Sequence, residues 1–132
     1  MASDTAHPAE RINRSAAGVY AYVSDPANIT EWAPGLGGKV EQVDGDWFVE
    51  TPGGRAKVVF APPNEFGVLD HEVTFASGET FYNPLRVVPY GEGSEIVFGV
   101  RRSPGVSDAD FDRDAGAVAT DLARLKDILE AH

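Results

Sequence analysis

The order of patterns along the chain constrains its fold more than any single motif does. A short helical opening is followed by residues 39–101, which alternate between strand and turn patterns, and the chain then carries one long amphipathic helix. Links of only a few residues between strands favour antiparallel neighbours. This order predicts an α+β fold in which a curved antiparallel sheet is crossed by a single helix, with a cavity between the two.

Six segments carry the strand pattern, and breakers rich in glycine or proline separate them. The segments are residues 39–43, 46–51, 55–61, 66–75, 79–88 and 94–101. Residues 11–14 are too short to assign alone, but Ile12 could lie in a first edge strand. The sequence therefore predicts a meander of six strands, or seven if Ile12 is included.

Two short helices in series are predicted before the strands. Ser15 is placed to cap the first, and Val19 and Val23 then recur at helical spacing. Asp25 is placed to cap the second, which is brief because the run from Trp32 to Gly35 breaks it.

The C-terminal helix has the clearest pattern in the sequence. Ser107 is placed as its N-cap, directly after a Pro-Gly stop. Apolar residues then recur every three or four positions on one face, and polar residues occupy the opposite face. The apolar face consists of Phe111, Ala115, Val118, Leu122, Leu125 and Leu129, and the polar face carries Arg113, Thr120, Arg124 and Asp127.

Composition restricts the classes of function. A chain of 132 residues has the size of one domain, in which we expect residues 1–10 to be flexible. It has no cysteine, so disulfides and cysteine-based metal sites are excluded. With 11 basic against 21 acidic residues, nucleic acid and anionic membranes are not expected partners. No apolar segment is long enough to cross a bilayer, so a cytoplasmic protein is expected, with its oligomeric state left open.

His71 is the first candidate for chemistry. Leu69, His71 and Val73 share one face of a predicted strand. If that face is the concave one, the imidazole projects toward the cavity, where it could act as an acid or base. The alternative, a core histidine hydrogen-bonded to a backbone carbonyl, is the preferred interpretation.

Tyr82 and Arg86 are the other candidates for catalysis. Arg86 lies in an apolar stretch, where its guanidinium could hold a ligand oxygen. The alternative is an ion pair at a strand end, with Glu79 or Glu95. Pro84 disturbs the alternation of the strand, so the sequence leaves open whether Tyr82 and Arg86 point inward.

Aromatic residues near the predicted gap between helix and sheet complete the candidate ligand site. We therefore expect a ligand to contact Trp32, His71, Tyr82, Arg86, Phe98 and Phe111. The acidic run from Asp108 to Asp114 lacks the glycine and glutamate that a calcium loop requires. No metal site and no cofactor are predicted.

Several segments, taken together, carry a resemblance to a known superfamily. They are residues 19–26 with Trp32, 66–71, 83–87, 93–98 and 121–126. With this element order, the chain resembles the helix-grip fold of the START-like, or SRPBCC, superfamily. Within it, the chain looks most like small bacterial polyketide cyclase/dehydrase-like proteins, which carry no settled catalytic signature.

The resemblance implies three functions, and the sequence does not decide whether the protein is an enzyme. The first is binding of a small hydrophobic or aromatic molecule in the cavity between the sheet and the C-terminal helix. An alternative is a cofactor-independent polyketide cyclase or dehydratase, with His71 as acid–base residue and with Arg86 and Tyr82 steadying an enolate oxygen. A second alternative is an interaction module like the chaperone activators of the superfamily.

Overall fold

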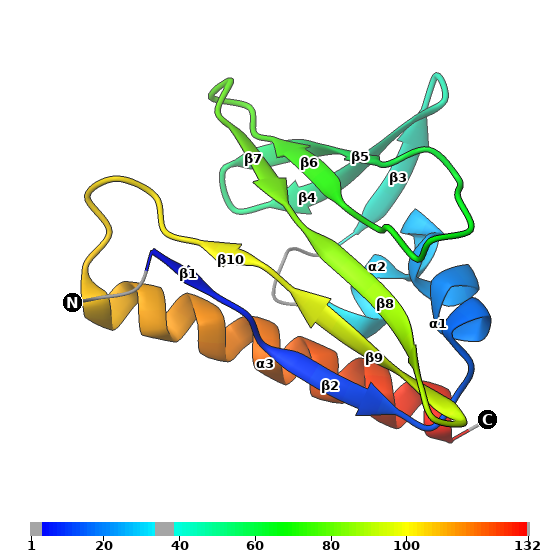
Figure 1. The fold of residues 1–132 in the computed structure, drawn as a ribbon. Coiled ribbons are helices and arrows are strands. Elements are labelled where there is room, and N and C mark those ends of the chain that lie inside the picture. The colour runs from blue at the N-terminus through cyan, green and yellow to red at the C-terminus, as the bar shows by residue number, and fades with distance from the viewer. Residues whose placement is uncertain (1–3, 34–38, 132) are drawn as a thin grey trace.

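An antiparallel sheet and a long C-terminal helix dominate the structure, a computed structural model that describes residues 4–33 and 39–131 (Figure 1). Its helices are α1 (Ala16–Val23), η1 (Pro26–Asn28), α2 (Ile29–Trp32) and α3 (Asp108–Glu130). Its strands are β1 (Thr5–Ala6), β2 (Ala9–Ile12), β3 (Val40–Val43), β4 (Asp46–Thr51), β5 (Gly54–Phe60), β6 (His71–Thr74), β7 (Thr80–Asn83), β8 (Leu85–Tyr90), β9 (Gly93–Phe98) and β10 (Val100–Arg101).

The strands join into one continuous antiparallel sheet. Pairing runs β3-β4-β5-β6-β7, β2-β9-β8 and β1-β10. Residues 67–69 extend β6 toward β8, because Leu69 N–H donates to Leu85 O at 2.8 Å and Val87 N–H donates to Gly67 O at 3.0 Å. β7 and β8 are thus two parts of one strand, as are β9 and β10, and β1 and β2. The six predicted strands are present, and the strand predicted around Ile12 is confirmed as β2.

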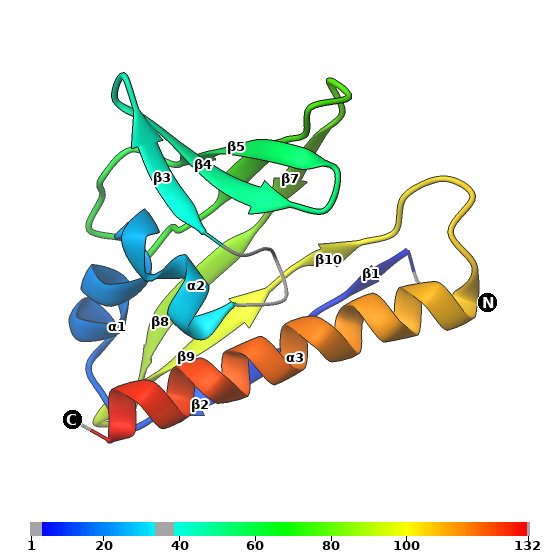
Figure 2. The same cartoon turned by 180° about the vertical axis from the view of Figure 1, so that it is seen from behind.

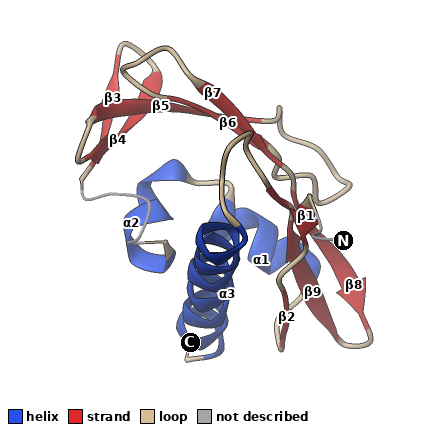
Figure 3. Cartoon of the chain, turned by 90° about the vertical axis from the view of Figure 1, so that its left-hand side faces the viewer, coloured by secondary structure: helices blue, strands red, loops and turns tan. Residues whose placement is uncertain are grey.

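The sheet bends along a row of interrupted strands (Figure 3). The registers on either side place Gly99 beside Pro84, with His7 and Asp70 next in the row. Pro84 has no N–H to donate, while its carbonyl accepts Gly99 N–H at 2.8 Å. A Cβ on Gly99 would lie 3.2 Å from the Pro84 ring, so the close approach of the two strands favours glycine. These residues explain why the strands break where the sheet turns.

The predicted helix caps are all present. Ser15 Oγ accepts the N–H of Gly18 at 3.1 Å, and Asp25 Oδ1 accepts the N–H of Ala27 at 3.0 Å. Ser107 Oγ accepts the N–H of Asp110 at 3.1 Å and begins α3. Local sequence therefore sets the start of each helix.

All three α-helices lie on the concave side of the sheet, and α3 runs across its open end (Figures 2 and 3). α3 packs on β2, β10 and α2, whereas α1 packs on β8 and β9. The predicted apolar face of α3 supplies the buried residues Phe111, Leu122 and Leu125, and the predicted polar face is exposed. Lys126 Nζ also donates to Arg11 O at 2.9 Å, which ties the end of α3 to β2.

One predicted region differs in the structure, and another lies outside the residues that the structure describes. Residues 5–10 were expected to belong to a flexible segment, but residues 5–6 form β1 and residues 9–10 form the first half of β2, paired with β10 and β9. The breaker expected at residues 34–35 lies outside the described residues. Within the described chain, no helix is long and apolar enough to cross a membrane.

Candidate functional site

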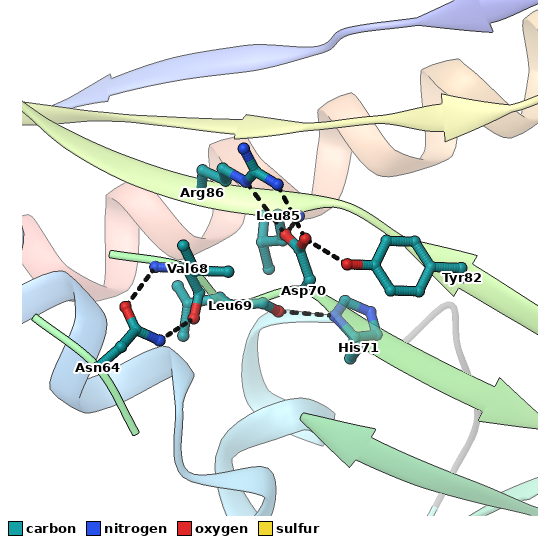
Figure 4. A network of polar contacts seen from close by, with 8 residues as sticks. All are labelled: Asn64, Val68, Leu69, Asp70, His71, Tyr82, Leu85 and Arg86. Atoms are coloured by element: carbon teal, nitrogen blue, oxygen red, sulfur yellow. Dashed lines mark hydrogen bonds and ion pairs between the residues drawn. The ribbon is translucent and has the colours of Figure 1, made fainter. Parts of the chain in front are cut away.

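At the bend, the side chains of Asp70 and His71 hydrogen-bond to the backbone of the paired residues Leu69 and Leu85. Leu69 N–H donates to Leu85 O at 2.8 Å. The other two groups of this pair bond side chains, because Leu85 N–H donates to Asp70 Oδ1 at 2.9 Å and Leu69 O lies 3.1 Å from His71 Nδ1 (Figure 4). Asp70 and His71 thus satisfy buried backbone groups that the bend separates.

The Asp70 carboxylate is the centre of a polar network. It is 3% exposed and receives the Tyr82 hydroxyl at 2.5 Å and Arg86 Nη2 at 3.0 Å (Figure 4). Burial raises the pKa of Asp70, but hydrogen bonds from Arg86, Tyr82 and Leu85 outweigh it and hold this pKa below its usual value. The hydrogen bond to Asp70 in turn raises the pKa of Tyr82. Asp70 is therefore ionised at neutral pH and held by its partners.

This network lies on the convex face of the sheet, opposite His71. Successive residues of a strand point to opposite faces, so Asp70 and His71 diverge. Tyr82 and Arg86 bond Asp70 and therefore lie on the same convex face. The guanidinium of Arg101 lies there too, 5.3 Å from the centre of the Tyr82 ring. The ion pair considered for Arg86 is present, with Asp70 rather than with Glu79 or Glu95 as its partner.

His71 lies on the concave face among aromatic rings. It is 4% exposed, and its ring centre lies 5.0 Å from that of Phe60 and 5.8 Å from that of Phe98. Because the Leu69 carbonyl can only accept, Nδ1 carries the hydrogen and Nε2 is left unprotonated. Burial lowers the pKa of His71, which keeps the ring neutral. Within the described residues, Nε2 makes no hydrogen bond, and it lies on the far side of the ring from Leu69 (Figure 4).

His71 lines a small cavity between the sheet and α2. Its volume is about 30 Å³, and its wall is mostly apolar. Trp32 of α2 is 3% exposed, and its indole Nε1 has no hydrogen-bond partner in the part of the chain that the structure describes. The lining residues are Ile29, Trp32, Val49, Thr51, Ala56, Val58, Phe60, His71, Val73 and Phe75.

A larger groove adjoins this cavity. It has a volume of about 390 Å³ and runs between α1, η1, the β3–β4 turn and the residues that follow β5. Tyr20, Trp47 and Phe60 supply aromatic walls. Val58 and Phe60 line both the groove and the cavity, so these two side chains stand between them.

The structure separates the residues predicted to form a ligand site. It brings Trp32 and His71 together in the cavity. Phe98 contacts the His71 ring, and Phe111 packs under the Arg102 guanidinium at 5.6 Å, but neither lines the cavity. Tyr82 and Arg86 lie on the other face.

The cavity expected between the sheet and the C-terminal helix lies beside α2 instead. No residue of α3 is among those that line it. The reason is that α3 packs on β2 and β10, whereas the cavity lies under β4, β5 and β6, on the other side of the bend.

Asp70 is the residue that sequence reasoning missed. Alternation puts Asp70 on the strand face opposite Leu69 and His71, together with Glu72 and Thr74, yet Asp70 is buried. The available signal was the combination of an aspartate in an apolar stretch with an arginine that the same meander brings opposite. Recognising this pair from the sequence requires knowing how the strands pair on either side of Pro84.

Comparisons with known proteins place the fold. No protein-family model matches the sequence, and neither does any curated protein. Among solved structures, DynU16, a protein of the dynemicin biosynthetic locus, superposes with a TM-score of 0.72 at 14% identity over 97% of this chain, which spans 48% of DynU16.

Two further structures match over nearly their whole length. Ara h 8.0201 superposes with a TM-score of 0.67 at 13% identity, covering 97% of this chain and 98% of its own. Truncated norcoclaurine synthase from Thalictrum flavum does so with a TM-score of 0.61 at 18% identity, covering 97% and 94%. With its bent antiparallel sheet closed by α3, this chain has the same helix-grip fold as these solved structures.

Proposed function

We propose that the protein binds a small hydrophobic or aromatic molecule on the concave side of its sheet. The body of the ligand lies in the groove beside α1 and η1, and one end reaches the cavity at His71. The observation that carries this proposal is the apolar cavity, with its buried imidazole, next to a groove walled by aromatic side chains.

The volumes determine how the ligand lies. The groove, at about 390 Å³, falls within the range of about 300–1,000 Å³ typical of small-molecule sites. The cavity, at about 30 Å³, is far below the roughly 150 Å³ of an engineered cavity that binds benzene. Only a small group of the ligand therefore reaches His71, next to Val58 and Phe60, which line both spaces.

The chemistry of the lining favours an uncharged ligand. His71 is the only ionisable side chain that lines the cavity among the described residues, and burial keeps it neutral. A charged group placed there would lose its hydration without gaining an opposite charge. Apolar surface buried in the groove instead contributes roughly 25 cal/mol per Å².

An enzymatic role remains the second candidate, and one observation favours it. The Nδ1–H of His71 is engaged by Leu69 O, which leaves Nε2 able to accept a proton. Tyr82 and Arg86 lie across the sheet, so His71 would act without them. DynU16 and norcoclaurine synthase are named for biosynthesis, but their identities of 14% and 18% to this chain support only the fold.

Native mass spectrometry of gently purified protein tests the proposal. We expect an added mass, lost on denaturation, that corresponds to a small organic molecule. Val73→Ile adds one methylene group to the cavity wall and should reduce the bound fraction. A bare protein mass, together with no response to a panel of aromatic compounds, would contradict ligand binding.

A further inference from the structure

We infer that the ligand carries a hydroxyl group that donates its hydrogen to Nε2 of His71, so that the site selects neutral phenols and alcohols over ethers and carboxylates of equal size. This inference rests on the proposed function and names the class of molecule bound.

The acceptor character of His71 follows from its hydrogen bond on the opposite side of the ring. A backbone carbonyl has no hydrogen to give, so the contact of 3.1 Å between Leu69 O and Nδ1 requires Nδ1–H. In a neutral imidazole the other nitrogen then presents a lone pair. Rings of Phe60 and Phe98, with centres at 5.0 and 5.8 Å, hold the imidazole in this orientation.

Among the described residues, Nε2 has no hydrogen-bond partner in the cavity. Most of its wall is aliphatic or aromatic, and no described group donates to Nε2. A ligand that fills this space with an apolar end would bury the lone pair unsatisfied, which is unfavourable. A hydroxyl hydrogen satisfies it. An ether oxygen has no hydrogen to offer, and a carboxylate brings a charge that no lining cation balances.

Trp32 provides the complementary group. Its buried Nε1–H has no acceptor in the described chain, and the indole lines the same cavity. A hydroxyl oxygen accepts as well as donates, so one hydroxyl is the smallest group that serves both Trp32 and His71. The volume of about 30 Å³ suits a group of that size.

Isothermal titration calorimetry with three matched probes tests this inference. The probes are 2-naphthol, 2-methoxynaphthalene and 2-naphthoate, which share one ring system and differ in the group presented to His71. We expect 2-naphthol to bind about tenfold more tightly than 2-methoxynaphthalene, the ratio that one net hydrogen bond supplies. We expect 2-naphthoate to bind most weakly.

The control variant is His71→Asn. The asparagine amide can still donate to Leu69 O, but it has no atom at the position of Nε2, so the preference for 2-naphthol should fall to about onefold. Side-chain ¹⁵N NMR of the wild-type protein gives a readout that needs no variant. We expect the Nδ1–H tautomer of His71, with an Nε2 resonance that moves upfield with 2-naphthol and not with 2-methoxynaphthalene.

The outcomes separate this inference from the proposed function. Equal affinity for 2-naphthol and 2-methoxynaphthalene, tightest binding of 2-naphthoate, an unchanged ratio in His71→Asn, or an Nε2–H tautomer would each overturn the inference alone. If none of the three probes binds, both the inference and the proposed function are overturned.

Discussion

Replacing Asp70 with alanine should destabilise the protein by far more than an ordinary surface change. Asp70 is 3% exposed and accepts the Leu85 N–H at 2.9 Å, so its removal leaves a buried donor without a partner. That donor costs about 1–3 kcal/mol. Hydrogen bonds to a charged group contribute about 1.5–3 kcal/mol, taken here at the low end because the Arg86 side chain is 58% exposed and regains water. We expect a loss of about 3 kcal/mol.

Two further variants identify the source of this loss. Asp70→Asn keeps an oxygen for the Leu85 N–H and removes only the charge, so we expect about half the effect of alanine. Glu72→Ala changes an exposed carboxylate on the same strand and should shift stability by no more than about 0.5 kcal/mol.

Urea unfolding followed by circular dichroism measures all three variants, with ΔG taken from the midpoint at a common slope. The reasoning about the bend fails if Asp70→Ala lies within about 1 kcal/mol of wild type, as for an ordinary surface change. It also fails if Asp70→Asn loses as much as Asp70→Ala, since the Leu85 N–H would then contribute nothing.

The pKa of Asp70 adds a dependence on pH. Because its folded-state pKa lies below the ordinary value of 3.8, its contribution to stability is present above about pH 4 and is lost as pH falls through the folded-state pKa. The stability of Asp70→Asn should therefore change less than that of wild type below pH 4.

Three other changes follow from the structure. Gly67→Ala should cost about 3 kcal/mol by urea unfolding, because a Cβ would lie 2.0 Å from a β8 carbonyl oxygen at a φ of +74°. Gly78→Ala, at a φ of +94° in open space, should cost only about 1 kcal/mol, and equal losses would contradict the close contact. Val73→Ile should stabilise the protein by up to about 0.8 kcal/mol, because the added methylene group fills the cavity. Val19→Ile should destabilise it, because Val19 is fully buried and lines no such space. Thermal unfolding measures both variants, and a change of the same sign in both would count against the cavity. The lowered pKa of His71 predicts that the wild-type protein loses stability as pH falls below about 6.5, and that the loss levels off below the folded-state pKa. His71→Asn should lack this pH-dependent loss. If the stability measured by urea unfolding changes with pH in the same way in both proteins, the prediction is refuted.

Local patterns in the sequence were sufficient to predict most of the fold. Ser15, Asp25 and Ser107 each precede a helix, and the side chain of each accepts one of the first free N–H groups of that helix. The start of each helix therefore depends on residues that are neighbours in the sequence. The strand meander could be predicted because alternation and short breakers are also patterns among residues close together in the sequence. β1 was missed because its pairing with β10 joins segments nearly a whole chain apart.

The site depends on relations that sequence does not display. Whether Tyr82 and Arg86 point inward depends on how the strand passes Pro84, where alternation is interrupted. The burial of Asp70 depends on the register that sets it opposite that proline. The position of the cavity depends on which half of the bent sheet α3 covers. His71 was correctly placed on an apolar face, because its strand alternates without interruption from Leu69 onward.

The most direct test of ligand binding uses the two tryptophan indole signals in a ¹H–¹⁵N correlation spectrum. Trp32 lines the cavity and Trp47 lines the groove, and a Trp47→Phe variant assigns them. On titration with 2-naphthol, we predict that both indole signals shift along one saturable curve, with the Trp32 N–H moving further because it gains an acceptor. Indole signals that stay fixed while 2-naphthol is raised to its solubility limit would contradict a binding site on the concave face.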